Sequence, residues 1–154
     1  MEASTISLFL TLSLIAATAA GQNSTETQGF LDAHNLARAE VGVQPLVWND
    51  TVADYAVSYA NNCTLEKSGG PYGENLATGE GQFTGEDAVS IWVSEGQNYS
   101  SSSNTCNGVS CEQYTQVVWR DSTQLGCALL ECSNLIFAIC CYYPPGNIAG
   151  QTPF

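Results

Sequence analysis

From Thr25 onward, apolar side chains recur at intervals of three and four residues, which is the spacing of one face of an amphipathic helix. Thr25 offers an N-terminal cap, and Gly42 supplies a residue type at which helices commonly end. The sequence therefore predicts a first helix between these two residues. Its predicted inward face consists of Phe30, Ala33, His34, Ala37 and Val41.

The same spacing predicts two further helices. The second begins at Asn49 or Asp50 and ends near Cys63, and the third covers about residues 85–95. An approximate capping box precedes the third helix, formed by Thr84 and Asp87. The side chains predicted to be buried are Val52, Tyr55, Ala56 and Tyr59 in the second helix, and Val89 and Trp92 in the third, with Ile91 as a further candidate.

The second half of the chain predicts strands instead. Residues 125–132 and 135–143 are apolar and rich in Leu, Ile, Phe and Tyr, and Ser133-Asn134 joins them, so a two-stranded hairpin is expected. Before the hairpin, residues 112–120 mix β-branched side chains with a tryptophan and predict a short buried or half-buried element. The proline-rich tail, residues 144–154, is expected to be irregular, either docked or loose. Helices packed on a small antiparallel sheet make an α+β domain.

An apolar run over residues 8–20 precedes these elements and ends in small residues. The run is too short to span a bilayer as a helix. It is typical of a secretory signal, although the segment before it holds Glu2 and no Lys or Arg. We therefore expect a signal peptide over residues 1–21, a single domain over residues 22–154, and an extracellular location in preference to the vacuole.

Secretion would place the seven cysteines in an oxidising compartment, where disulfides form and persist. With a single His in the chain and no paired CxxC spacing, they predict a disulfide framework and not a metal cluster. An odd number leaves at least one thiol over. Cys106 and Cys111 are only five residues apart, which makes a local bridge between them plausible.

The chain is strongly acidic. Three basic residues face fifteen acids, for a net charge of −12. Loss of Glu2 with the signal leaves a net charge of −11. Such a field repels phosphates and anionic bilayers, so nucleic acid and membrane surfaces are excluded as electrostatic partners. Four Asn-x-Ser/Thr sequons are candidate glycosylation sites, and the alternative is that they arise by chance: Asn23, Asn49, Asn62 and Asn98.

Few residues could carry catalysis or bind a metal. His34 is the only base of the usual kind, and its place on an inward helix face favours a core histidine over a catalytic one. With the cysteines in bridges, only carboxylates remain as metal ligands, and Glu74 and Glu95 are the candidates. The alternative is that Glu74 bonds nearby backbone amides and Glu95 lies on a solvated helix face.

Five motifs follow one another along the chain: His34-Asn35 with Arg38, Gly42-Val43 with Pro45-Leu46 and Trp48, residues 71–76, residues 114–120, and Cys140 with Tyr142 and residues 144–147. In this order they closely resemble the plant pathogenesis-related class 1 proteins of the CAP superfamily. The resemblance covers essentially all of residues 22–154 and implies an α-β-α sandwich, with helices on both faces of a small antiparallel sheet. It also implies the bridges Cys63–Cys132, Cys106–Cys111 and Cys127–Cys140, which leave Cys141 as a free thiol or an intermolecular handle. For a plant protein, the expected extracellular location is the apoplast.

The resemblance also places a cleft tetrad, in which relatives carry His-Glu-Glu-His for a divalent metal. The matching positions are Lys67, Glu74, Glu95 and Gln113, so both imidazoles are missing. A protonated ammonium is no metal ligand and an amide is a poor one, so we expect no metal and no cofactor. Our hypothesis for Lys67 is that it places a fixed positive charge between the two carboxylates.

The resemblance implies a non-enzymatic defence protein, expected as a monomer, that binds a sterol, another lipid or a pathogen-derived partner. The loop thought to bind sterols in relatives has one aromatic residue here, Tyr99, so affinity should be weak or depend on Tyr99 and the tail. One alternative is a precursor, because the tail resembles a released defence-signalling peptide. The weakest is a metal-dependent hydrolase, which would need the two missing histidines. Cys141 offers a route to a disulfide-linked dimer.

Overall fold

The computed structural model describes residues 23–154, so the predicted signal peptide lies outside the described residues. No helix within this range is long and apolar enough to cross a membrane. In chain order the elements are α1 (Ser24–Glu40), β1 (Val47–Trp48), α2 (Asp50–Ala60), β2 (Gly73–Gly79), α3 (Gly85–Ser94), the 3-10 helix η1 (Glu95–Asn98), β3 (Tyr99–Ser100), β4 (Thr105–Cys106), α4 (Glu112–Val117), β5 (Gln124–Cys132) and β6 (Leu135–Tyr143).

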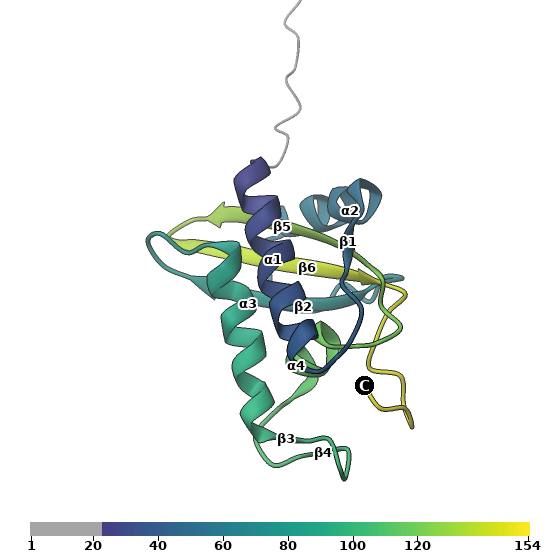
Figure 1. Ribbon diagram of the computed structural model, residues 1–154. Coiled ribbons are helices and arrows are strands. Elements are labelled where there is room, and N and C mark those ends of the chain that lie inside the picture. The colour runs from purple at the N-terminus through teal and green to yellow at the C-terminus, as the bar shows by residue number, and fades with distance from the viewer. Residues whose placement is uncertain (1–22) are drawn as a thin grey trace, which may run out of the picture.

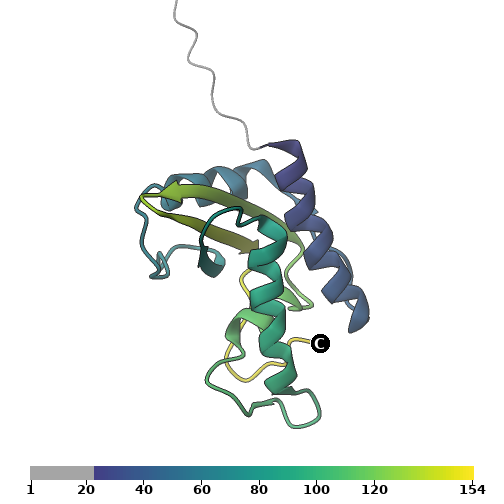
Figure 2. The same ribbon diagram turned by 90° about the vertical axis from the view of Figure 1, so that its left-hand side faces the viewer.

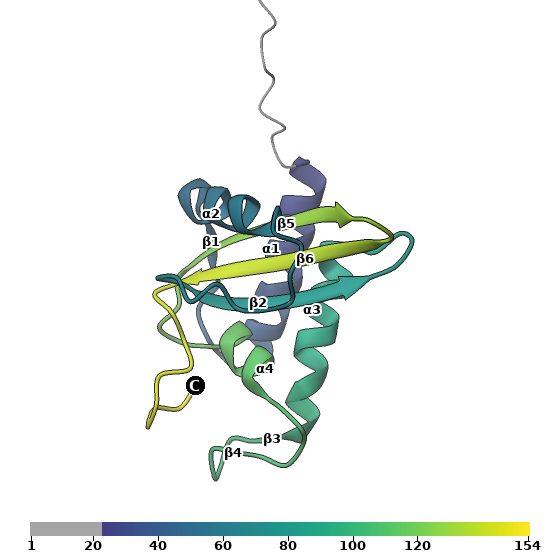
Figure 3. The ribbon, with the colours of Figure 1, turned by 180° about the vertical axis from the view of Figure 1, so that it is seen from behind.

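Four strands form one sheet in the order β1-β5-β6-β2. β6 pairs antiparallel with both β5 and β2, whereas the short β1 runs parallel to β5. Helices α1 and α3 lie on one face of this sheet (Figure 1) and α2 lies on the other (Figure 3). The predicted α+β class and the α-β-α sandwich are therefore confirmed, with one short parallel strand added to the expected antiparallel sheet.

Strand β6 separates two apolar cores, because successive side chains of a strand point to opposite faces. Ala138, Cys140 and Tyr142 pack toward α1 and α3, in a core that contains Phe30 and Trp92. The residues between them pack toward α2, in a second core of Val52, Ala56, Ala60, Ala128, Phe137, Ile139 and Cys141.

Most of the predicted helix starts and ends are found in the structure, with one cap displaced. Asn23 caps α1 by accepting a hydrogen bond from Thr25 N at 3.2 Å, so the predicted cap at Thr25 is wrong by two residues. Gly42 has a φ of +73° just after α1, and the box of Thr84 with Asp87 opens α3. Ile91 is exposed, unlike the other predicted core residues of α3.

Strand β2 is the longest of the elements that the sequence pattern does not predict. It contains two glycines, a glutamate and an asparagine, all residues with low strand propensity. Pairing with the apolar β6 along its whole length stabilises it nevertheless. The expected half-buried element over residues 112–120 begins as the short helix α4.

The predicted hairpin is confirmed as β5 and β6, and Ser133 adopts a φ of +59° in its turn. Three disulfides join the cysteines that the resemblance pairs: Cys63–Cys132, Cys106–Cys111 and Cys127–Cys140. Cys141 has no bridge and is fully buried against α2, on the opposite face from Cys140. Burial also raises the pKa of its thiol, so the conformation described offers no handle to a second chain.

Candidate functional site

Glu74 is a buried carboxylate at the start of β2. It accepts hydrogen bonds from Ser68 N, at 2.7 Å, and from the Ser68 hydroxyl. Its cross-strand neighbour in the sheet is Cys141, so the Glu74 side chain starts on the α2 side of β2. The alternative reading of this residue, in which it bonds the backbone of its own glycine-rich loop, matches these contacts.

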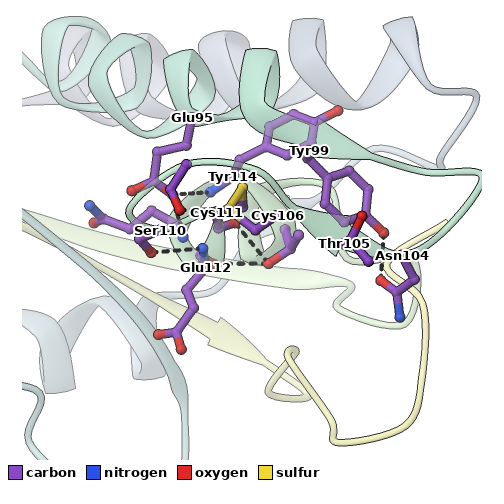
Figure 4. Close-up of a disulfide and its surroundings, with 12 residues drawn as sticks. Glu95, Tyr99, Asn104, Thr105, Cys106, Ser110, Cys111, Glu112 and Tyr114 are labelled. Carbon is purple, nitrogen blue, oxygen red and sulfur yellow. Dashed lines mark hydrogen bonds between the residues drawn. A yellow bond between two sulfur atoms is a disulfide. The ribbon is translucent and has the colours of Figure 1, made fainter.

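Glu95 follows α3 and holds the start of α4. Its Oε2 accepts hydrogen bonds from Gln113 N at 2.9 Å and Tyr114 N at 3.2 Å. These amides are among the first of α4, where helical N–H groups have no partner of their own. Figure 4 shows the Glu95 carboxylate reaching across to this end of α4.

Gln113 joins α4 to the edge of the sheet. Its side-chain Oε1 accepts a hydrogen bond from Leu76 N at 3.3 Å, and its backbone carbonyl accepts one from Asn75 Nδ2 at 2.9 Å. Trp92 Nε1 donates to the carbonyl of Leu76 at 3.0 Å. The N–H and C=O of Leu76 at the sheet edge are therefore both hydrogen-bonded. Gln113 links α4 to β2 and does not act as a metal ligand.

Lys67 forms no ion pair with either tetrad carboxylate, so the structure gives no support to the hypothesis that its charge links the two. Its Nζ lies 3.3 Å from Glu112 Oε2, the one ion pair among residues 23–154, and both side chains are more than half exposed. The physical reason is that Glu74 is already satisfied by Ser68 and Glu95 by the amides of α4. The ammonium pairs instead with Glu112, whose carboxylate accepts no other hydrogen bond among residues 23–154.

These contacts do not fit a divalent metal. No three His, Cys, Asp or Glu side chains of residues 23–154 converge as a ligand set. The two glutamates are engaged by different elements, and the positions of the relatives' histidines hold an ammonium and an amide, which are not good ligands.

His34 is a fully buried core histidine. Its Nδ1 lies 2.7 Å from the carbonyl of Phe30, which can only accept, so Nδ1 carries the proton. Its Nε2 then accepts from the Tyr142 hydroxyl, also at 2.7 Å. Burial, with a smaller contribution from Arg38, lowers the pKa of His34 to about 4 despite the opposing hydrogen bond to Phe30. No ligand reaches this imidazole.

Tyr99 lies in an aromatic cluster at the far end of α3. Its ring centroid is 5.9 Å from that of Tyr114 and 6.0 Å from that of Phe154, the last residue of the tail. Its hydroxyl donates to Asn104 Oδ1 at 2.7 Å, beside the Cys106–Cys111 bridge (Figure 4). Tyr99 and the tail, named together as candidates for a lipid contact, are therefore neighbours.

An apolar groove between α1 and α3 is the feature that sequence reasoning missed. The two helices lie side by side in Figures 1 and 2. The groove encloses about 190 Å³ between Ala33, Leu36, Ala37, Glu40, Glu86, Val89, Ser90 and Val93. Leu36 is 68% exposed, which leaves a large apolar side chain at its rim. The sequence did offer one signal. Ala33 and Ala37 are small residues one turn apart on α1, and the nearby Leu36 is an apolar residue outside the predicted buried face.

The tail is docked. Gly146 N donates to Gln116 Oε1 at 2.9 Å, and Arg120 N donates to the carbonyl of Pro153 at 2.7 Å. Asn147 donates to the carbonyl of Glu112 at 2.8 Å. Pro153 is buried, so the last residues of the tail are held against the body as well as its first residues.

The four sequons differ in how their side chains are used. The Oδ1 of Asn49 caps α2 and its Nδ2 donates to Gln124 at 2.6 Å. Asn98 is half-buried in η1. Asn23 and Asn62 are exposed, and Asn23 uses only its Oδ1, for the α1 cap.

Known proteins share both this sequence and this fold. The profile of the cysteine-rich secretory protein (CAP) family matches residues 31–143. Pathogenesis-related protein 1C of Nicotiana tabacum is 50% identical over 98% of this chain and 91% of its own length. Pathogenesis-related protein 1 of Arabidopsis thaliana is 53% identical over 82% of this chain and 81% of its own length.

The fold comparison agrees. The crystal structure of NaASP2 with Zn²⁺ superposes with a TM-score of 0.77 at 25% identity and covers 88% of each chain. The motifs, the three disulfides and the helix–sheet–helix layers thus lead to one conclusion. The chain belongs to the CAP family of cysteine-rich secretory proteins and, within it, to the defence-related plant pathogenesis-related class 1 proteins.

Proposed function

We propose that this protein is a secreted, non-enzymatic binding module whose ligand is a sterol or another neutral lipid. The observation that carries the proposal is the apolar groove between α1 and α3, which is lined by Ala33, Ala37, Val89 and Val93 and flanked by the exposed Leu36. Burial of an apolar ligand contributes about 0.8 kcal/mol for each CH₂ removed from water. A pathogen-derived protein remains the other kind of partner that we expect for this family.

The rim of the groove favours an uncharged ligand. Glu40 and Glu86 line it together with Ser90, and no basic side chain does. A fatty-acid carboxylate would meet like charges there, which costs free energy. A sterol hydroxyl could instead bond Ser90 or either carboxylate.

The chemistry of the described residues supports a binding role over hydrolysis. A hydrolase needs an accessible base or a metal-activated water. His34 is buried, and Lys67 and Gln113 stand where relatives carry histidines. One structural relative, NaASP2, is solved with Zn²⁺, but the contacts of Glu74 and Glu95 give this chain no equivalent ligand set.

One observation favours a second role as a peptide precursor. Tyr143 is 46% exposed and Pro144 is exposed, so the junction between β6 and the tail is accessible to a protease. Cleavage there would release residues 144–154 once their hydrogen bonds to the body were broken. Mass spectrometry of secreted protein tests this role: the peptide of residues 144–154 supports it, and only intact chain contradicts it.

Titration with a fluorescent sterol tests the lipid site. Ala33→Phe fills the groove and should weaken binding at least ten-fold, whereas Ala39→Phe adds the same ring on an exposed part of α1 and should not. Tyr99→Ala tests the aromatic cluster as the competing site. Unchanged binding in Ala33→Phe, or its loss only in Tyr99→Ala, would overturn the groove as the site.

A further inference from the structure

A second groove, polar in contrast to the apolar groove, lies between the tail (residues 144–154) and α4. It consists of two adjoining cavities of about 310 Å³ and about 280 Å³, which share Glu112 and Asn147 as lining residues. Tyr72 lines the first cavity, and Gln151 and Pro153 line the second. We call the pair the tail groove. Because the two cavities adjoin, the tail groove can hold a ligand longer than either cavity alone.

The polar groups at the centre of the tail groove are matched to hydroxyls. The Glu112 carboxylate can accept, and the Lys67 ammonium beside it, 3.3 Å away, can donate. Both side chains are more than half exposed, so their remaining hydrogen-bonding capacity faces the groove and solvent. Two neighbouring hydroxyls on one ligand can satisfy this pair at once, the first as a donor to Glu112 and the second as an acceptor from Lys67.

An aromatic ring supplies apolar surface in the first cavity of the tail groove. Tyr72 is half-buried and braced by Tyr55, with ring centroids 4.9 Å apart, and by Tyr143, at 6.1 Å. A fixed ring offers a flat apolar face at little entropic cost. A sugar ring combines an apolar face of C–H groups with a rim of hydroxyls that both donate and accept.

Other ligand classes fit less well. The acids Glu74 and Glu112 and the net charge of −12 oppose an anion. An extended peptide commonly pairs with a free strand edge, but the N–H and C=O of Leu76 on the edge strand β2 are already bonded to Gln113 and Trp92. We propose that the tail groove binds a neutral oligosaccharide, with Tyr72 against one sugar face and the Lys67–Glu112 pair on adjacent hydroxyls.

The tail forms one wall of this site. Gly146 and Asn147 line the first cavity and are bonded to Gln116 and Glu112 of α4. A sugar in the groove contacts the tail and the body together, so it stabilises the docked tail by linkage. Loss of residues 144–154 removes the wall and the site with it.

Backbone NMR of the full secreted chain tests the proposal. The probes are neutral hexasaccharides of β-1,3-linked glucose, β-1,4-linked glucose and N-acetylglucosamine, with an acidic oligogalacturonide as the charged comparison. We expect at least one neutral probe to shift the amide signals of Tyr72, Gly73 and Asn147 saturably. Glu112→Ala should weaken that binding at least ten-fold, and Glu131→Ala, which removes an exposed acid outside the groove, should leave it unchanged.

A second readout needs no variant. The neutral probe that binds should slow proteolysis between Tyr143 and Pro144 several-fold in the wild-type chain. The proposal is overturned if no neutral probe shifts the groove signals at millimolar concentration or if the acidic probe binds there instead. It is also overturned if Glu112→Ala binds as well as wild type, or if a bound sugar gives the tail no protection. None of these results bears on the lipid groove, which lies on other elements.

Discussion

The imidazole of His34 on α1 and the hydroxyl of Tyr142 on β6 lie 2.7 Å apart inside the larger core. The Tyr142 hydroxyl donates to His34 Nε2 and accepts from Asn75 Nδ2 at 3.1 Å. One buried network therefore joins α1, the central strand β6 and the edge strand β2. Because the network needs a neutral imidazole, protonation of His34 opposes folding.

Stability should therefore fall as the pH drops from 6.5 toward 4. The folded-state pKa of His34 is about 4, below its ordinary 6.5, so the unfolded chain binds the proton more readily. The stabilising contribution is fully present above pH 6.5 and is lost as the pH falls to 4. It amounts to about 3 kcal/mol. Chemical denaturation at a series of pH values measures it.

His34→Gln is the control for this pH dependence. A glutamine keeps a donor and an acceptor in the core but does not titrate, so the variant should lose the slope between pH 6.5 and 4 whatever its absolute stability. An unchanged slope in His34→Gln would assign the effect to other groups.

Gly126 on β5 permits the close approach of α2 to the sheet. A Cβ at this position would overlap the backbone of Val52 and Ala53. We expect Gly126→Ala to destabilise the protein by about 1–3 kcal/mol or more, the usual cost of overpacking. Gly29→Ala adds the same methyl on α1, where it meets only the flexible Glu86 side chain, and should be neutral or stabilising. Thermal denaturation of both variants gives the comparison, and equal melting temperatures would contradict it.

Glycosylation should discriminate among the four sequons. A glycan is attached through Nδ2, and at Asn49 that atom donates to Gln124 while Oδ1 caps α2. Asn62 is exposed and Asn23 leaves its Nδ2 unused, so both should be occupied far more often than Asn49. Glycopeptide mass spectrometry of chain expressed through a plant secretory pathway measures occupancy. High occupancy at Asn49 would show that the hydrogen bond from its Nδ2 to Gln124 does not hinder glycosylation.

Zinc should not bind stoichiometrically to the wild-type chain. Lys67 and Gln113 are poor ligands, and the carboxylates of Glu74 and Glu95 are already bonded to backbone amides. Calorimetric titration of refolded protein should show only weak heats. The double variant Lys67→His with Gln113→His supplies both imidazoles and should bind more tightly. Tight one-to-one binding by wild type would revive the metal-dependent alternative.

Local signals predicted much of the fold. The stripe through Phe30 and Ala37, the box at Thr84 and the apolar runs of the hairpin each specify their own element. β2 could not be predicted in this way, because its residues have little strand propensity and it forms by pairing with β6. The disulfide pairing required the family resemblance, since seven cysteines leave many connectivities open.

The candidate site likewise combines features that the local sequence predicts with features that depend on long-range packing. The residue types at Lys67 and Gln113 were enough to predict poor metal ligands. Their partners depend on long-range packing: Lys67 pairs with Glu112, 45 residues away, and Gln113 with Leu76, 37 residues away. The apolar groove and the tail groove arise between elements distant in the sequence, so neither has a contiguous motif.

Sterol binding with and without a metal chelator tests the central claim most directly. A fluorescent sterol is titrated into the wild-type chain in EDTA and again in excess zinc. The account predicts saturable one-to-one binding with the same affinity in both conditions, because the apolar groove contains no metal ligand set. Absence of sterol binding, or binding that requires zinc, would contradict it.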